Sequence, residues 1–252
     1  MTILARMFVV RHGETDSNRN RIVQGQLDTP LNATGLAQAA MTAEALKSVS
    51  FDKAFTSDLQ RASKTAERIL QCHTDIELVQ DSALRERVRV EFNFELLKSW
   101  SFIEQFMGEM QGKKGPVDMT GLSDLSSIET DDAFVQRCIT WYNRVIVPNI
   151  SVTKPDVSEG QCRNILVSSH GAFIATLFHI MISTNHVTCP AELKLRGLPT
   201  LGNASISIVE YRTVLRGKHR EVEADILKYG DISHLCGLRV MEENVDVEID
   251  QS

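Results

Sequence analysis

The sequence predicts an α/β fold of three layers, in which a mainly parallel central sheet lies between two layers of helices. Short apolar runs typical of buried strands alternate along the chain with stretches of helical periodicity. Three of the strand runs stop at polar residues, around Arg11, Ser57 and Ser169, and the last two of these lie just before a helix. This alternation is typical of a doubly wound sheet whose strands run in parallel.

The composition favours one domain that spans residues 1–252. A chain of 252 residues, 42% of them hydrophobic, can bury a sizeable core without dividing. The sequence contains no internal repeat, low-complexity tract or interdomain linker. Only the acidic tail at about 241–252 is expected to fray.

The first half of the chain predicts strands at 8–10, 51–56 and 76–79. Asn32 or Thr34 caps a helix that ends near Lys47, and Ser57 or Asp58 caps the next one. The expected inner face of the first helix is Leu36, Ala39, Ala40, Ala43 and Leu46, and that of the second is Ala62, Ala66, Ile69 and Leu70. The polar residues at 16–29 are expected to form a loop over the end of the first strand.

The second half is less regular. Residues 84–111 are ambiguous, with a helical signal around 96–110, and Gly, Pro and Ser favour a loop over 112–127. Asp131 or Asp132 opens a long amphipathic helix, with a packing stripe of Phe134, Ile139, Tyr142, Val145 and Ile146. The remaining expected elements are a polar connection at 153–161, strands at 165–169, 205–211 and 221–228, and a helix at 172–181.

Charge and cysteine content exclude several classes of function. The net charge is −6 with no block of Lys or Arg, which argues against a nucleic-acid or membrane-surface protein. No apolar run reaches transmembrane length. The five scattered cysteines form no C-x-x-C pair, so we expect reduced thiols, no metal site and a cytoplasmic location.

The chemistry of the chain begins where the first strand ends, at Arg11-His12-Gly13. Arg11 offers a forked and permanently charged donor for an oxyanion. His12 can act as a neutral nucleophile near pH 7, and Gly13 allows a sharp turn beside a phosphate-sized group. Taken alone, this tripeptide fits a strand end with a solvated Arg-His pair better than an active site.

Two further strand ends repeat this chemistry. His170 and Gly171 follow a second buried strand and precede a helix, whose N-terminus is a natural anion site. Arg61 lies at a third strand-to-helix junction. Ligands of open α/β sheets bind beyond the carboxyl ends of the strands. A phosphate pocket made by His12, His170 and the two arginines is therefore the economical explanation.

With these residues in place, the sequence resembles the histidine phosphatase (phosphoglycerate mutase-like) superfamily, and within it the TIGAR-type fructose-2,6-bisphosphatase branch. The matching blocks run in family order from about residue 8 to residue 210. They are Arg11-His12-Gly13-Glu14-Thr15 with Asn18, Gln24-Gly25, Asp28, Pro30-Leu31, Thr34-Gly35, Gln38-Ala39, Ser57-Asp58-Leu59-Gln60-Arg61-Ala62, Thr65-Ala66, Leu84-Arg85-Glu86, His170-Gly171 and Gly202-Asn203.

The resemblance implies a phosphoglycerate mutase-like fold and a cofactor-free, metal-independent phosphatase. His12 would be the nucleophile that forms a phosphohistidine, and Arg11, Arg61 and His170 would hold the phosphoryl oxygens. Glu86 would give a proton to the leaving oxygen and then activate water. The flanking arginines would keep His12 neutral. The implied residues at the phosphate or the neighbouring substrate groups are Asn18, Gln24, Gly25, Gly171 and Asn203.

The substrate implied is a small phosphorylated metabolite, first fructose 2,6-bisphosphate, whose removal would regulate glycolysis, and second a bisphosphoglycerate. Two segments depart from the family pattern: residues 87–95 contain no glycine, and only Glu129-Thr130 remains of a Pro-Gly-Gly-Glu-Ser/Thr segment. Because these segments line the substrate mouth in relatives, substrate specificity stays open. A phosphoglycerate mutase and a phosphate-binding protein with little turnover are the alternatives, and the charged Arg85-Glu86-Arg87 run also fits a solvated surface cluster.

Overall fold

The computed structural model describes residues 2–73, 75–87, 129–150, 162–183, 187–191, 193, 197–216 and 219–237. Its strands form a seven-stranded sheet in the order β3-β2-β4-β1-β6-β7-β5. They are β1 (Thr2–Arg11), β2 (Lys53–Thr56), β3 (Leu78–Gln80), β4 (Arg163–Ser169), β5 (Val187–Thr188), β6 (Ile206–Arg216) and β7 (His219–Asp231). The helices are α1 (Asp16–Arg19), α2 (Ala33–Leu46), α3 (Gln60–Leu70), α5 (Asp131–Val145), α6 (Val147–Ile150) and α7 (Gly171–Ser183), with short 3₁₀ turns η1 (Ser82–Leu84) and η4 (Ser233–Leu235).

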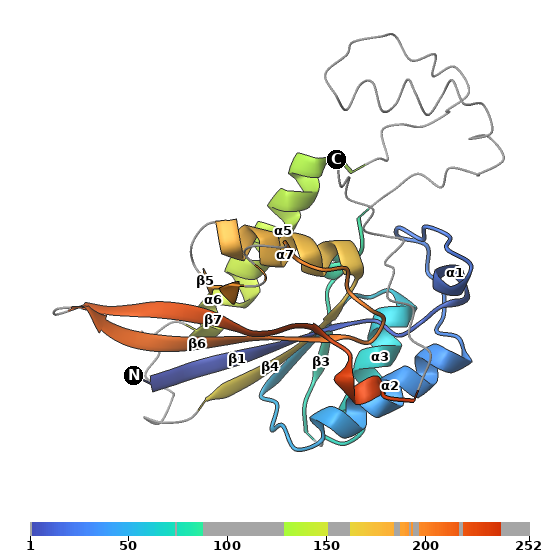
Figure 1. Ribbon diagram of the computed structural model, residues 1–252, viewed down its shortest axis with the longest axis horizontal. Helices are drawn as coiled ribbons and strands as arrows, with labels where there is room; N and C mark the ends of the chain where they lie inside the picture. Colours follow the sequence, from blue (N-terminus) through green and yellow to red (C-terminus); the bar gives the residue numbers. More distant parts are fainter. Residues whose placement is uncertain are drawn as a thin grey trace, which may run out of the picture.

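The sheet is mainly parallel, as the sequence predicts. Strands β3, β2, β4 and β1 pair in parallel, and β5 pairs in parallel with β7. Only β6 among the described strands runs against its neighbours, antiparallel to both β1 and β7. Strands β6 and β7 form the long hairpin that extends past the helices (Figure 1).

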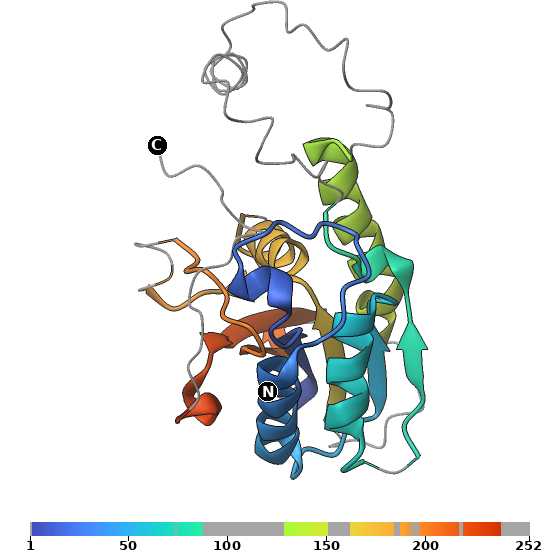
Figure 2. The same cartoon turned by 90° about the vertical axis from the view of Figure 1, so that its right-hand side faces the viewer.

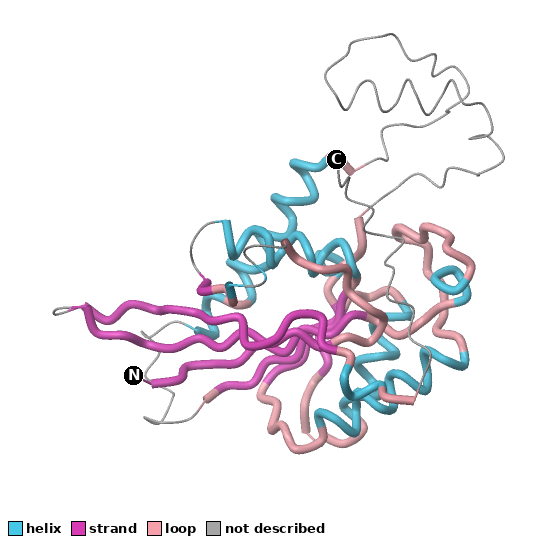
Figure 3. Tube along the Cα trace, viewed as in Figure 1, coloured by secondary structure: helices cyan, strands magenta, loops and turns pink. Residues whose placement is uncertain are grey.

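The helices cover the sheet in two layers (Figures 1 and 3). Successive side chains of a strand point to opposite faces, so β1 serves two cores at once. Met7 and Val9 belong to the core beneath α5 and α7, whereas Phe8 and Val10 pack in the other core with Leu46 of α2. A strand that is buried on both faces requires an almost continuous apolar run, which is what the sequence provides.

Local capping matches the expectation at α2 and differs from it at α3. Asn32 caps α2 by accepting from the Gly35 amide, so Thr34 is not the cap. Neither Ser57 nor Asp58 caps α3, which begins after Leu59 without a cap from its own segment. The cap comes instead from Asp28, whose Oδ1 accepts from the Gln60 amide at 2.6 Å.

The inner faces of two helices were also predicted in part wrongly. Leu36 of α2 is 55% exposed, and the buried face of this helix consists of Gly35, Gln38, Ala39, Thr42, Ala43 and Leu46. In α5, which Thr130 caps, the most buried stripe includes Cys138 and Trp141 in place of Ile139. Trp141 packs edge-to-face on Phe173 of α7.

Several expectations lie outside the described residues: the helical signal at 96–110, the loop at 112–127, the connection at 153–161 and the tail at 241–252. The polar segment at 16–29 contains α1, a helix of one turn, before the expected loop. In the described part of the chain, no helix combines the length and the apolar character that a membrane crossing requires.

Candidate active site

The predicted site residues come from strands that end at the same edge of the sheet, which faces the viewer in Figure 2. Arg11, the last residue of β1, is in register with Ser169, the last residue of β4. The antiparallel strand β6 begins at this edge, where Ile206 is in register with Val10. The segments that follow β1 and β4 and precede β6 therefore meet, and they carry His12, His170 and Asn203.

The main chain of His12 is held on two sides. Its amide donates to the Ser169 carbonyl at 3.0 Å, and its carbonyl accepts from the Ala204 amide at 3.0 Å. The same carbonyl accepts from Nδ2 of Asn203 at 3.2 Å. These contacts fix the imidazole to the ends of three strands rather than to a free loop.

The glycine after His12 is required by close packing. A Cβ atom at Gly13 would lie 2.5 Å from the carbonyl oxygen of Gly35, and a Cβ at Gly35 would lie 2.0 Å from the carbonyl oxygen of Glu14. Real Cβ atoms do not approach backbone oxygen this closely, so both positions exclude larger residues. Gly13 is not among the glycines that have a positive φ in the described part of the chain. The close contact with the start of α2 therefore accounts for glycine at position 13.

The tautomer of His12 follows from its hydrogen bond. Nδ1 lies 2.7 Å from the carbonyl oxygen of Gly13, which can only accept, so Nδ1 carries the proton. The opposite nitrogen, Nε2, is buried and has no hydrogen-bond partner among the described residues. A neutral imidazole held in this way presents the Nε2 lone pair to the pocket.

His170 lies directly beside His12. The ring centroids are 5.1 Å apart at 57°, and both side chains are fully buried. The pKa of His12 is lowered well below its usual value by burial and then by the charges of Arg61 and Arg11. Burial also lowers the pKa of His170 strongly, followed by the charge of Arg61. Both rings are therefore neutral near pH 7, as predicted for His12.

This pair makes the fold sensitive to acid. The unfolded chain takes up protons on histidine near the usual pKa of 6.5, whereas the folded protein resists protonation of both rings. The two histidines therefore contribute their full stabilisation above pH 6.5. Below this pH the free energy of unfolding falls, by up to about 1.4 kcal/mol per pH unit for each histidine. We expect His12→Gln to reduce this slope when urea unfolding is measured between about pH 5 and 6.5.

A matched control for the acid experiment is His179→Gln, because His179 is exposed on α7. This variant leaves the buried pair of His12 and His170 intact, so it should keep the slope of the unmodified protein. Equal slopes in His12→Gln and the unmodified protein would contradict a neutral, buried His12.

Arg11 and Arg61 are fully buried, and each ties a loop to the site. Nη1 of Arg11 donates to the Leu201 carbonyl at 2.5 Å. Nη1 and Nη2 of Arg61 donate to the carbonyls of Leu27 and Gly25 at 2.6 and 2.8 Å. Both guanidinium charges also act on the histidines, as the lowered pKa of His12 shows. Their contact with phosphoryl oxygens stays a prediction.

The loop over the site is anchored to the first turn of α3. Besides the contacts of Arg61, Oδ2 of Asp28 accepts from Nε2 of Gln60 at 2.9 Å. Gly25 has a φ of +50°, a conformation that glycine adopts without strain. Gln24 is buried in this loop, and its Oε1 accepts from the hydroxyls of Thr15, at 2.9 Å, and of Thr29.

Glu86 does not belong to a solvated cluster. Only 1% of it is exposed, and its two oxygens accept from the amides of Arg87, at 2.8 Å, and Ala172, at 3.1 Å. Ala172 lies in the first turn of α7, next to His170, so the carboxyl group lies at the same helix N-terminus. Of the neighbouring arginines, Arg85 pairs with Asp58 and Arg87 with Asp131.

Asn18 and Asn203 are hydrogen-bonded to each other, and Asn203 also contacts the main chain of His12. Oδ1 of Asn18 accepts from Nδ2 of Asn203 at 3.2 Å and from the Thr15 amide at 3.2 Å. Asn18 also forms a capping box with Thr15 at the start of α1. Gly171 is the first residue of α7. The structure thus gathers all the predicted site residues at one edge of the sheet, and it shows Asn18, Gln24 and Asn203 supporting the loop around His12.

Sequence reasoning missed Arg137, which contacts the Glu86 segment. Arg137 lies three residues after Phe134 and four before Trp141, so it occupies the buried side of α5. An arginine on an apolar helix face requires a buried partner, which is the signal that could have identified it. Gln26, which donates to the Glu86 carbonyl at 3.0 Å, carried no such signal.

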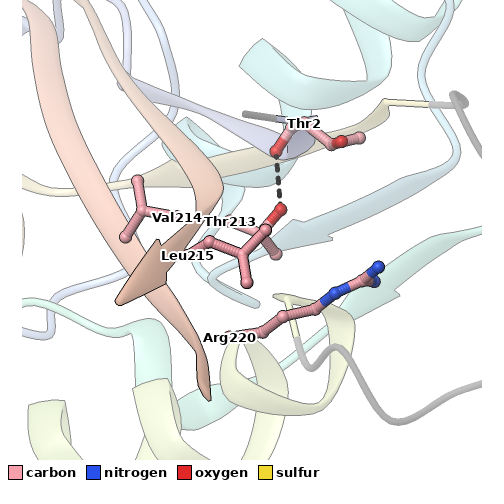
Figure 4. A pocket seen from close by; sticks show the side chains of 5 residues that line it. All are labelled: Thr2, Thr213, Val214, Leu215 and Arg220. Carbon is pink, nitrogen blue, oxygen red and sulfur yellow. Dashed lines mark hydrogen bonds between the residues drawn. The ribbon is translucent and has the colours of Figure 1, made fainter. Parts of the chain in front are cut away.

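A separate cleft of about 110 Å³ lies at the far end of the sheet, beside the start of β1 and the β6–β7 hairpin (Figure 4). It contains none of the predicted site residues, and its lining is Thr2, Thr213, Val214, Leu215 and Arg220. Within the described ranges, no three His, Cys, Asp or Glu side chains are grouped as metal ligands.

Comparison with known proteins agrees with this geometry. A probable phosphoglycerate mutase, GpmB, of Proteus mirabilis is 32% identical over 241 residues, which cover 95% of this chain and 99% of that protein. Fructose-2,6-bisphosphatase TIGAR B of Danio rerio is 49% identical over 85 residues, 32% of this chain, so the match spans only 33% of that relative. The solved phosphoglycerate mutase from Bacillus anthracis str. Sterne, 22% identical, superposes with a TM-score of 0.66 over 93% of this chain and 96% of its own.

The family model of the histidine phosphatase superfamily (branch 1) matches residues 7–216. That range contains every predicted site residue, from Arg11 to Asn203. The chain therefore belongs to the histidine phosphatase superfamily.

Proposed function

We propose that the protein hydrolyses small phosphate monoesters through a phosphohistidine on Nε2 of His12, without a metal ion or cofactor. The observation that carries this proposal is the fixed tautomer of His12. Its Nδ1–H is bound to the Gly13 carbonyl, Nε2 is buried, and the ring lies beside the second neutral histidine, His170. A neutral nitrogen with an oriented lone pair is the nucleophile that phosphoryl transfer requires.

In the first step, Nε2 of His12 attacks phosphorus and the ester P–O bond breaks. Glu86, in its protonated form, donates its proton to the leaving oxygen. The charges of Arg11 and Arg61 and a donated N–H of His170 stabilise the transferring group. In the second step, Glu86 takes a proton from water, whose oxygen attacks phosphorus. The P–N bond breaks, and phosphate and neutral His12 are released.

The first substrate that we propose is fructose 2,6-bisphosphate, giving fructose 6-phosphate and phosphate, in the cytoplasm and with an effect on glycolysis. The support is the strong similarity of one third of the chain to a fructose-2,6-bisphosphatase. A bisphosphoglycerate is the second substrate. A phosphoglycerate mutase is the competing function, because the probable mutase of Proteus mirabilis matches over 95% of this chain.

The deciding experiment measures phosphate release from fructose 2,6-bisphosphate, a bisphosphoglycerate and an aryl phosphate, with EDTA present and absent. We expect the fructose ester to be hydrolysed fastest and EDTA to leave every rate unchanged. Similar modest rates on all three would indicate a broad phosphatase, and loss of turnover in EDTA would contradict the metal-free mechanism.

The mutase alternative requires its own assay. The protein is incubated with 3-phosphoglycerate, and both free phosphate and the 2-isomer are measured. A mutase returns the phosphoryl group to the product, so it forms the 2-isomer without net phosphate release. We expect the reverse, because the proposed Glu86 base activates water.

A further inference from the structure

We propose that Arg137 of α5 is the positioning residue that fixes Glu86 for proton transfer, an inference that rests on the proposed phosphatase function. Arg137 is held at the base of α5 by Glu129. Nε and Nη2 donate to the two oxygens of that carboxylate at 2.7 Å each. The exposed fractions of the two side chains are 19% and 13%, so this forked pair is largely withdrawn from water.

The remaining N–H groups of Arg137 are directed at the segment that carries Glu86. Nη1 donates to the carbonyls of Ala83, at 2.9 Å, and Arg85, at 2.8 Å. Nη2 also donates to the carbonyl of Glu86 at 3.3 Å. A guanidinium has five N–H donors in one plane, and here all five have an acceptor. Lysine cannot reproduce this arrangement, because its three donors diverge from one atom.

These contacts define the direction of the Glu86 side chain. The carbonyls of Arg85 and Glu86 belong to the two rigid peptide planes on either side of the Glu86 Cα atom. Holding both planes therefore fixes the direction of its Cα–Cβ bond. Ser169 completes the support by donating to the Leu84 carbonyl at 2.7 Å, so four consecutive carbonyls of this segment are bound.

The same contacts assign a structural role to Glu129 and Thr130, the two residues that remain here of the Pro-Gly-Gly-Glu-Ser/Thr segment of the family. Glu129 orients Arg137, and Thr130 caps α5 by accepting from the Ala133 amide at 3.2 Å. The absence of glycine at 87–95 then need not change the direction of the Glu86 side chain, because Arg137 of α5 and Ser169 of β4 hold the main chain that carries it. Burial is the main cause that lowers the pKa of His170, and the charge of Arg137 is the smallest of the further causes.

The test compares two esters that differ in their leaving group. The alcohol of glycerol phosphate must be protonated as it leaves, whereas the phenolate of p-nitrophenyl phosphate leaves without a proton. A displaced general acid therefore slows formation of the phosphohistidine only from the first ester. The later attack of water, in which Glu86 is the base, is common to both esters, so the rates compared are those of phosphohistidine formation in a single turnover. We expect Arg137→Met to lower this rate for glycerol phosphate about 10²-fold and to leave it nearly unchanged for p-nitrophenyl phosphate.

Two further variants distinguish positioning from general damage. Arg144→Met removes an exposed arginine of the same helix, which pairs with Asp81 at 2.5 Å, and should leave both rates unchanged. In a Glu86→Gln background, Arg137→Met should add little further loss, because both changes remove the same proton transfer. Arg137→Lys keeps a charge beside Glu129 if the methionine variant fails to fold, and it should show the same preference for the aryl ester.

Hydrogen–deuterium exchange of residues 83–87 gives a readout that needs no activity. We expect faster exchange in Arg137→Met and Arg137→Lys and no change in Arg144→Met. Unchanged exchange, equal losses on the two esters, or additive losses with Glu86→Gln would overturn the role of Arg137. If the unmodified protein cleaves neither ester, the proposed function fails, and the exchange result alone then decides whether Arg137 fixes the Glu86 segment.

Discussion

Replacing His12 by alanine is expected to lower kcat by about 10⁴-fold or more, because the variant lacks the atom that accepts the phosphoryl group. Nε2 of His12 is buried beside His170 and points away from the Nδ1 contact with Gly13. The measurement is phosphate release, together with the amount of acid-labile phosphate that stays on the protein after rapid quenching. The unmodified protein should carry this label, and the variant should not.

The control for this variant must separate chemistry from folding. His12→Asn retains a donor for the Gly13 carbonyl and should unfold at a similar temperature while remaining inactive. His179→Ala removes an exposed histidine of α7 and should keep full activity. Label on a residue other than His12, or activity that survives in both His12 variants, would refute the phosphohistidine mechanism.

Replacing Glu86 by glutamine is expected to slow hydrolysis of alkyl phosphates by about 10²–10⁴-fold, because the amide cannot donate the carboxylic proton. The aryl ester should be affected less in its first step. Glutamine is also unable to act as base toward water, so the phosphohistidine should accumulate. The measurement is the ratio of the single-turnover rates at which glycerol phosphate and p-nitrophenyl phosphate form the phosphohistidine, followed by the level of phosphoenzyme.

Glu86→Gln also removes a hydrogen bond that stabilises the fold, and this loss of stability must be measured separately from the loss of rate. Both oxygens of Glu86 accept from backbone amides, those of Arg87 and Ala172. An amide nitrogen in place of one oxygen leaves one of these N–H groups without an acceptor, at a cost of about 1–3 kcal/mol in stability. Glu44→Gln, an exposed change on α2, serves as the matched control. Equal losses in the rate of phosphohistidine formation from both esters would exclude Glu86 as the proton donor.

Strand positions and the principal site residues could be predicted from the sequence because their signals are local. Apolar runs specify buried strands, and parallel strands place their carboxyl ends at one edge. Arg11, His12 and His170 follow directly from that rule, since each stands at or just after the end of β1 or β4. Glu86 was assigned to the site by the family resemblance, because the local sequence also fits a solvated charge cluster on the surface.

The parts that were missed depend on contacts between distant segments. The cap of α3 comes from Asp28, which lies 32 residues before Gln60 in the chain. Burial of Glu86 depends on α7, 86 residues further on, and its support comes from Arg137. Gly13 is required by Gly35, through a backbone contact that no local pattern reveals. Local propensity contains none of this information, because tertiary packing decides it.

The place of β1 in the sheet has a consequence for how the protein folds. Its neighbours are β4 and β6, so Arg11 comes into register with Ser169 and Val10 with Ile206 only after very long loops have closed. Closing such loops costs chain entropy before any contact compensates for it, and proteins dominated by distant pairings fold slowly. After dilution from denaturant, helical signals should therefore recover before activity. Recovered turnover then reports that the centre of the sheet has assembled, and no short fragment of the chain can contain a complete site.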